Sequence, residues 1–467
     1  MHPQRPLWLI ALLLQVPPGA PAAENPTVAT EGSHLLLDSR WVAMAQNARL
    51  VLGTVQKHPG NPLMAEDHPW EARFDNLYAN VIHDPADNLY KCWYSPFIVD
   101  LPAKGLTPAQ RKTIRYRPPA GREMGVCYAV SHDGLLWEKP GLHLVDFEGT
   151  GNNNLVVRGP HGAGILLDPA DPDPERRYKM FRAEDMRYSS DGLQWTAPQT
   201  STGILSRSDT HNNLLRVPES GRYVGFVRLW SDGWGRGQRI VGRTESADLQ
   251  QWSRAVEVLR GDALHQTYAM PVFRYAGVYL GLVAVFRTEE DRVHTELAWS
   301  PDTVSWNRIQ PGTPFLGNSA TEGDYDWGCV YAAASPVVLE DGIRIYYGGS
   351  NGPHTSWRDG FLCLSTLRPD GWAGYEPQDP SAPALITTRP VECIGDNLWI
   401  TSDVTDGGKI LVTTLDEAGH PLDRVTITQT GTRAIAGRLL AFRNRPVKVN
   451  LEVTKAKVYS FGFADDP

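Results

Sequence analysis

The chain has 467 residues, and its 45 Lys and Arg against 53 Asp and Glu give a net charge of −8 and a pI near 5.9. This acidic balance disfavours nucleic-acid binding, so we expect no nucleic-acid partner. With 43 Gly, 36 Pro and 41% hydrophobic residues, the composition is that of a turn-rich globular chain able to bury a sizeable core.

The first 23 residues have the pattern of a secretory signal. Arg5 precedes an apolar run over residues 7–16, and small residues and prolines follow as far as Ala23. This order predicts a signal peptide over residues 1–23 and a secreted or periplasmic protein. No later stretch approaches the ~20 apolar residues of a membrane-spanning helix, so we expect no membrane partner.

A sequence motif of the form Ser-x-Asp-x-x-x-Trp recurs along the chain. Its four copies occupy residues 131–137, 189–195, 246–252 and 300–306, so the tryptophans are 58, 57 and 54 residues apart. A degenerate fifth copy ends at Trp372, another 66 residues on. A period near fifty with short strand-like runs between the copies is typical of a β-propeller.

The repeated motif has a structural explanation. Asp hydrogen-bonds to backbone amides ahead of it and Gly accepts positive φ, so the Asp or Asp-Gly predicts a hairpin corner. The Trp that follows is expected to be a packing wedge between neighbouring sheets. We therefore assign these repeated residues to the fold and not to catalysis.

Strand-like runs with period-two alternation precede each copy and define five units. The predicted fold is all-β: a five-bladed β-propeller over residues 24–384, followed by a small β-sandwich over residues 385–467. A strand from residues 24–70 is expected to complete the last blade. The sandwich either binds sugar or buttresses the propeller, and the buttress is the favoured alternative.

The five cysteines show no C-x-x-C pair and no zinc spacing; they are Cys92, Cys127, Cys329, Cys363 and Cys393. We expect buried free thiols, although Cys92 and Cys127 are placed to meet across the first unit. No metal site and no cofactor are predicted, and a structural Ca²⁺ in the channel is left open.

In a propeller the innermost strands converge on a channel, and the residues that open them face one mouth. Here those openings carry many polar groups. The predicted substrate-binding residues are Asn76, Asn154, His211, His265, Tyr268, Asp326, Tyr347 and His354. Acidic groups from different blades around one mouth fit glycoside hydrolysis, which needs one acid and one carboxylate.

With these features the chain resembles the five-bladed propeller glycosidases, the group that includes glycoside hydrolase families 32, 43, 117 and 130. The shared features are His58-x-x-Asn61-Pro62, an Asp at the opening of blade one (Asp75), the Ser-x-Asp-x-x-x-Trp hairpins and a following β-sandwich as in family 32. The Trp-Met-Asn-Asp-Pro-Asn signature of family 32 is absent, which argues against fructans and sucrose as substrates.

The resemblance implies catalytic roles for three carboxyl groups. Asp75 would be the base or nucleophile and Asp209 the second carboxylate. The acid would be a Glu from a middle blade, and Glu296 is the candidate; an ordinary exposed strand position is its alternative. Glu71, Glu184 and Glu322 are further candidates for which a solvated surface position is favoured.

The expected substrate is a polysaccharide or oligosaccharide, with an anionic glycan as one possibility. Residues 97–125 carry six Lys and Arg against Asp100 and Glu123, and such an insertion can favour carboxylate or sulfate groups. The alternative is a solvated loop.

Two rival functions follow from the same pattern. The first is a non-catalytic carbohydrate-binding or scaffold propeller that has kept the mouth and lost the acid. The second is a sialidase, which needs three arginines converging on the substrate carboxylate and a Tyr nucleophile. The strand openings above offer no such trio.

Overall fold

The computed structural model describes residues 32–37, 39–111, 113, 121–206, 208–233, 235 and 237–465. The predicted signal peptide lies outside these residues. One α-helix, the single turn α1 (Pro108–Arg111), occurs in the described chain, and the rest is strands, turns and the short 3-10 helices η1 (Leu101–Ala103), η2 (Pro174–Arg176) and η3 (Leu440–Phe442). The all-β prediction is confirmed. None of the described helices has the length and apolar character needed to cross a bilayer.

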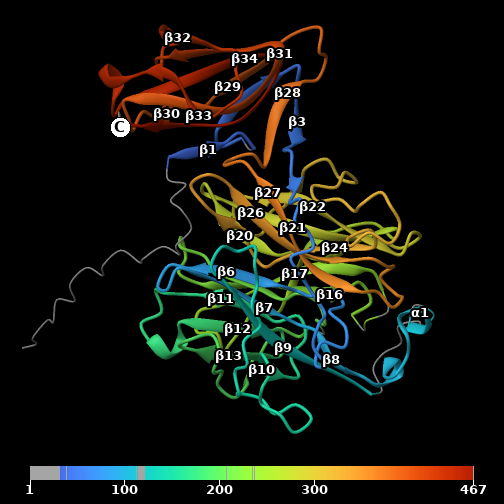
Figure 1. Ribbon diagram of the computed structural model, residues 1–467. Coiled ribbons are helices and arrows are strands. Elements are labelled where there is room, and N and C mark those ends of the chain that lie inside the picture. The colour runs from blue at the N-terminus through green and yellow to red at the C-terminus, as the bar shows by residue number, and fades with distance from the viewer. Residues whose placement is uncertain are drawn as a thin grey trace, which may run out of the picture.

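Five antiparallel units follow one another in the order of the repeat (Figure 1). Unit one contains β6 (Asn80–Asp84), β7 (Leu89–Tyr94), β8 (Phe97–Asp100), β9 (Arg122–Ser131) and β10 (Leu155–Arg158). Unit two contains β11 (Gly164–Leu167), β12 (Tyr178–Arg182), β13 (Asp185–Ser189) and β14 (Gln199–Thr200). Unit three contains β15 (Asn213–Arg216), β16 (Tyr223–Trp230), β17 (Arg239–Ser246) and β18 (Val256–Arg260).

Units four and five belong to one continuous sheet, joined where Val293 pairs with Cys329. Unit four contains β19 (His265–Ala269), β20 (Val272–Tyr275), β21 (Val278–Arg287), β22 (Arg292–Ser300) and β23 (Asn307–Arg308). Unit five contains β24 (Cys329–Ala332), β25 (Val337–Val338), β26 (Ile343–Ser350) and β27 (Gly360–Leu367).

The outer edge of unit five is completed from the N-terminal part of the chain. Strands β4 (Gln56–Lys57) and β5 (Met64–Ala65) both pair with β27. Between them, the Asn61 amide bonds to both backbone groups of Leu364, at 2.8 Å each. The prediction that an N-terminal strand completes the last unit is therefore confirmed, and the Asn61 of the early motif has a structural contact.

The repeated motif forms the expected hairpin corner. In the first copy, the Asp133 carboxylate accepts the amides of Leu135 and Leu136, both at 2.8 Å, and Gly134 has φ +73°. The same contacts recur at the later copies. The third copy places Leu249 in this left-handed position, with φ +65°. The carboxylates are therefore committed to their turns.

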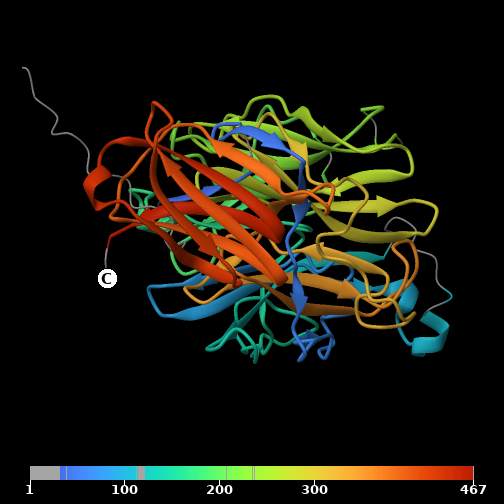
Figure 2. The ribbon, with the colours of Figure 1, turned by 90° about the horizontal axis from the view of Figure 1, so that it is seen from above.

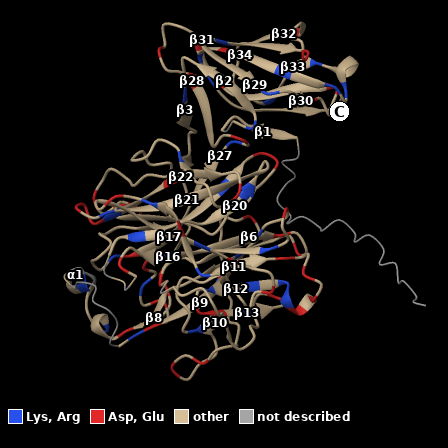
Figure 3. Cartoon of the chain, turned by 180° about the vertical axis from the view of Figure 1, so that it is seen from behind, with Lys and Arg blue, Asp and Glu red and all other residues tan. Residues whose placement is uncertain are grey.

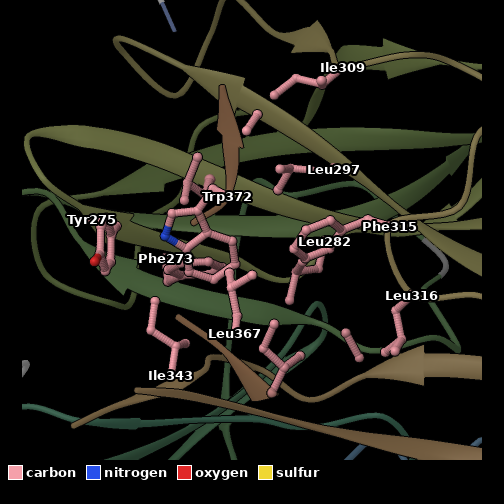
Figure 4. Close-up of a cluster of buried hydrophobic side chains, with 14 of the residues drawn as sticks. Phe273, Tyr275, Leu282, Leu297, Ile309, Phe315, Leu316, Ile343, Leu367 and Trp372 are labelled. Atoms are coloured by element: carbon pink, nitrogen blue, oxygen red, sulfur yellow. The ribbon is translucent and has the colours of Figure 1, made fainter. Parts of the chain in front are cut away.

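The repeated tryptophans pack against the preceding unit. The ring-centroid distances are 5.8 Å for Trp137 to Tyr346, 5.0 Å for Trp252 to Phe181, 5.7 Å for Trp306 to Phe226 and 5.2 Å for Trp372 to Phe273. Figure 4 shows Trp372, which is fully buried, among Phe273 and Phe315 of the unit-four region. Since Trp137 of unit one packs on unit five, this wedge contact also joins the first and last units.

The innermost strands also contact one another in order. β6 meets β11, β11 meets β15, β15 meets β20, and β25 returns to β6. Asn80 ties units one and two, because its side chain bonds to Ala163 O at 2.9 Å and Ile165 N at 2.8 Å. Asn213 reaches both Val272 of unit four and Ala334 of unit five. Buried amides therefore hold the centre together.

A ten-stranded sheet covers one end of the units (Figures 1 and 2). Its strands are β1 (Ser33–Leu35), β2 (Val42–Gln46), β3 (Ala48–Leu52), β28 (Ala373–Pro377), β29 (Ala384–Thr388), β30 (Val391–Glu392), β31 (Asn397–Leu415), β32 (Pro421–Ile427), β33 (Gly431–Arg438) and β34 (Pro446–Ala464). It takes strands from both ends of the chain, whereas the repeat pattern placed its start at residue 385. The division into domains stays a prediction.

The remaining general expectations concern thiols and charge. All five cysteines are free and buried, as expected. Lys and Arg positions alternate with Asp and Glu positions along much of the ribbon (Figure 3).

Candidate active site

The segment that leads into β6 has a strained backbone. Asp75, Leu77 and Tyr78 have φ of +57°, +62° and +45°, a left-handed conformation that costs non-glycine residues roughly 1–2 kcal/mol each. Asp75 is only 7% exposed and Tyr78 only 1%. Strain of this kind persists where surrounding contacts enforce it, and it is common at functional sites.

Two arginines hold the Asp75 carboxylate. Arg73 Nη2 forms an ion pair with Asp75 Oδ1, and Arg358 Nη2 lies 2.9 Å from the same oxygen. Arg358 also donates to Asn76 Oδ1 at 2.5 Å. Burial opposes ionisation of Asp75, but the two guanidinium groups outweigh it and hold its pKa well below the usual range. Asp75 is therefore an ionised carboxylate at neutral pH.

Glu66 lies beside this segment in the opposite protonation state. Its Oε1 accepts the amide of Phe74 at 2.6 Å and that of Gly360 at 3.1 Å, so it touches the chain next to Asp75 and near Arg358. Burial raises the pKa of Glu66 to about 8, although these two hydrogen bonds oppose the shift. At neutral pH Glu66 is mainly a carboxylic acid.

Aromatic and imidazole rings from all five units meet at the centre. The ring-centroid distances are 5.2 Å from Tyr78 to His161, 5.6 Å from Tyr78 to His211, 5.9 Å from Tyr78 to Tyr331, 5.5 Å from Tyr268 to Tyr331 and 5.0 Å from Tyr268 to His354. We name Asp75, Asn76 and these rings the central cluster. Burial lowers the pKa of His161 to about 4 and that of His211 to about 3, so both imidazoles are neutral at pH 7.

Asp209 stands at the exposed edge of the central cluster. Its side chain is 75% exposed and is ion-paired with Arg228. The Arg228 guanidinium lies 5.0 Å from the ring centroid of Tyr268. Asp209 therefore reaches the central cluster through Arg228 and Tyr268, and it is far more exposed to solvent than Asp75.

The structure brings together five of the eleven predicted site residues. Asp75, Asn76, His211, Tyr268 and His354 lie in the central cluster. His265 begins β19, and its half-exposed ring lies 3.2 Å from the Asp262 carboxylate, outside the cluster contacts.

Glu296 does not fit the predicted role of acid. It is fully buried on β22, and its Oε2 is bound by Arg308 Nε at 3.1 Å, while Oε1 contacts His294 Nε2 and the amide of Gly312, both at 3.0 Å. Burial opposes ionisation, but His294 and Arg308 outweigh it and lower the pKa of Glu296. An ionised carboxylate with both oxygens occupied has no proton to donate.

Three other predicted residues belong to separate networks. Asn154 accepts from Trp70 Nε1 at 2.6 Å and donates to Tyr94 and Tyr128. The fully buried Asp326 accepts from Tyr347 OH at 2.8 Å and pairs with Lys57 Nζ at 2.6 Å. Their polar atoms bond to the protein itself, because buried polar groups need hydrogen-bond partners.

The alternative acids likewise lie elsewhere. Glu71 is buried against Lys139 Nζ at 2.7 Å and accepts from Tyr94 OH at 2.5 Å. Glu184 is half-exposed beside Arg182, and Glu322 is exposed.

Strand-opening reasoning missed several members of the site, among them Glu66, Arg73, Tyr78, His161, Arg228, Arg239, Tyr331 and Arg358. The strand-opening pattern predicts carboxylates and amides at the first residues of inner strands, and these residues do not have that character or position. Arg73 carries the clearest signal, because an Arg two residues before a buried Asp can pair with it. Arg358 follows β26 by several residues, and only the fold shows that its loop reaches Asp75.

The basic insertion reaches the site through one contact chain. The Arg111 guanidinium lies 5.2 Å from the ring centroid of Trp357, and that of Arg73 lies 5.4 Å from the same ring. Arg122 and Lys104 instead pair with Asp100 and Glu148. Lys112, Arg115 and Arg117 lie outside the described residues.

Among the described residues, no group of three or more His, Cys, Asp or Glu side chains is arranged to hold a metal ion. The channel calcium ion therefore stays an open prediction.

Comparison with known proteins gives no family match: no family model and no curated protein matches the sequence. Among solved structures, a β-1,2-mannobiose phosphorylase from Listeria innocua is 15% identical, with 68% of this chain and 97% of that chain covered and a TM-score of 0.43. A family 43 arabinoxylan arabinofuranohydrolase from Bacillus subtilis is 11% identical over 88% of this chain and 99% of that chain, with a TM-score of 0.39.

A family 130 structure, described among glycoside hydrolases that target β-1,2-mannosidic linkages in Candida mannan, is 13% identical, covers 68% of this chain and 95% of that chain, and has a TM-score of 0.41. TM-scores below 0.5 do not establish a shared fold or activity.

Proposed function

We propose that the protein is a secreted glycoside hydrolase in which a five-bladed β-propeller carries the active site at its mouth. The ten-stranded sheet, which takes strands from both ends of the chain, would buttress it. The ordered contacts of the inner strands and the packing of Trp137 on unit five support closure of the ring. Secretion is supported by the sequence pattern of residues 1–23 alone.

The observation that carries the proposal is that Glu66, which contacts the Phe74 amide, and Asp75, the next residue, have opposite protonation states. Environments that separate two pKa values in this way assign acid and base roles. Glu66, protonated up to about pH 8, would donate its proton to the leaving glycosidic oxygen. Asp75, ionised at neutral pH, would stabilise positive charge at the anomeric carbon, attack that carbon, or activate water.

The neutral rings of the central cluster would contact the sugar. Imidazole and phenol groups supply hydrogen bonds to hydroxyls, and aromatic faces accommodate the C–H faces of a pyranose. Asp209, at the exposed edge, would bind or orient the substrate as the second carboxylate.

One observation favours a second candidate, a non-catalytic carbohydrate-binding propeller. Arg73 and Arg358 both engage Asp75, and a carboxylate so strongly stabilised is a weak base. A tyrosine nucleophile, as in a sialidase, is disfavoured because burial raises the pKa of Tyr78 well above its ordinary value.

A screen of the purified protein against plant and algal oligosaccharides, with product analysis, tests the proposal. Substitution of the acid, Glu66→Gln, should abolish release from natural substrates while preserving most turnover of a 2,4-dinitrophenyl glycoside of the same sugar, whose leaving group needs no proton. Glu417→Gln, at an exposed position, is the matched control.

If the Glu66→Gln variant loses turnover equally on both substrate types, Glu66 is not the general acid. Binding without release from any member of the panel would favour the non-catalytic propeller.

A further inference from the structure

Two arginines of unit three stand side by side at the edge of the central cluster. In the β16–β17 register, Trp230 is paired with Arg239, and Arg228 lies two residues before Trp230. Both guanidinium groups lie over the same two rings. Arg228 is 4.7 Å from the Trp230 centroid and 5.0 Å from that of Tyr268, and Arg239 is 5.0 and 5.1 Å from them.

This pair is under-compensated in charge. Arg228 is 3% exposed and has one acidic partner, Asp209, which is itself 75% exposed to water. In the part of the chain that the structure describes, Arg239 has no carboxylate within ion-pair distance. Its Nη1 donates to Gln266 Oε1 at 3.0 Å, and that neutral amide oxygen balances none of its charge. Partly buried like charges are costly unless a counter-ion joins them.

The surroundings keep these guanidinium groups positioned. Phe286 adds a third ring 5.0 Å from Arg239, so cation–π contacts cover the guanidinium faces. Stacking uses the faces and leaves the N–H edges available, which is the geometry that Arg offers to a planar or tetrahedral oxyanion. Burial lowers the pKa of Arg239, and Arg228 lowers it further, so a bound anion would relieve both effects.

We propose that Arg228 and Arg239 form an anion subsite that binds a carboxylate or sulfate ester on the glycan substrate. The inference rests on the proposed function for its position, because Tyr268 links the pair to His354 and Tyr331 of the central cluster. It is distinct from the basic insertion, whose described arginines contact Trp357 or Asp100.

The test compares binding by calorimetry of charged and neutral members of matched pairs: trigalacturonate with its carboxyl-reduced counterpart, and a sulfated carrageenan tetrasaccharide with its desulfated form. Wild-type protein should bind at least one charged member tenfold or more tightly than its neutral partner. The arm that shows this preference identifies the anion.

Arg239→Gln should remove that preference, and Arg239→Lys should restore part of it. Arg274→Gln, which alters an exposed arginine paired with Glu219 in the neighbouring unit, should leave binding unchanged. Equal binding of charged and neutral members by wild-type protein, or an undiminished preference in Arg239→Gln, would overturn the subsite.

The two proposals fail in different ways. Hydrolysis of neutral glycans without charge preference would contradict the anion subsite and leave the hydrolase proposal intact. Charge-selective binding by a protein that releases no product would support the subsite and contradict the hydrolase.

Discussion

Replacing Glu66 by Gln should make the protein more resistant to alkaline pH. In the folded protein Glu66 keeps its proton up to about pH 8, whereas its ordinary pKa is 4.5. Between these values the folded state binds more protons than the unfolded state, so the free energy of unfolding falls as pH rises. A Gln amide can accept the same two backbone hydrogen bonds and does not ionise.

The magnitude follows from that interval. At about 1.4 kcal/mol per pH unit, ionising Glu66 costs the folded state at most about 5 kcal/mol above pH 8. The side chain is partly exposed, so screening by water reduces the expected loss to about 2–3 kcal/mol. This loss should be absent below pH 4.5 and complete above pH 8.

Urea unfolding followed by tryptophan fluorescence at intervals between pH 5 and 9 measures this difference. The wild-type protein should lose about 2–3 kcal/mol more than Glu66→Gln across the range, and Glu417→Gln should follow the wild type. If the wild-type and Glu66→Gln curves stay parallel within about 0.5 kcal/mol, the pKa of Glu66 is not raised in the folded protein and its assignment as the acid fails.

Three further predictions concern the fold. Gly192→Ala should lower the free energy of unfolding by about 2–4 kcal/mol, because its φ is +78° and an added Cβ would lie 2.5 Å from the Trp93 ring. The control Gly221→Ala, at φ +66° with open space around it, should cost only about 1 kcal/mol in the same urea titration. Equal losses in the two variants would contradict the close contact between Gly192 and Trp93. Arg308→Leu should destabilise the protein by about 3 kcal/mol, because it removes the charged partner of the buried Glu296. The turnover per folded molecule should be unchanged. A selective loss of turnover would indicate that Glu296 takes part in catalysis. All five thiols should be unreactive toward a thiol reagent in native protein and react after unfolding, since they are free and buried; a rapidly labelled native thiol would contradict this.

Much of the fold was predictable because its rules are local. The Ser-x-Asp turn is specified within a few residues, as Asp133 and its two amide contacts show. The tryptophan spacing then sets the length of each unit. The strands β1 to β3 were not predictable as part of the C-terminal sheet, because their pairing with β28, β29 and β34 depends on contacts hundreds of residues apart.

The site was predictable only in part, for the same reason. Asp75 and His211 follow from their positions at strand openings. Asp326 has an equivalent position, yet Lys57 from the distant β4 and Tyr347 bind it. Glu66 has no sequence signal as an acid, since its pKa is raised by its burial in the folded chain.

We expect Asp75 to take part directly in glycosidic bond cleavage. The most direct test of this role is the rate of product release by Asp75→Asn, measured on an oligosaccharide that the wild-type protein cleaves and at matched fractions of folded protein. The rate should fall roughly 10³-fold or more, with glycan affinity largely retained. Release at the wild-type rate would contradict this role.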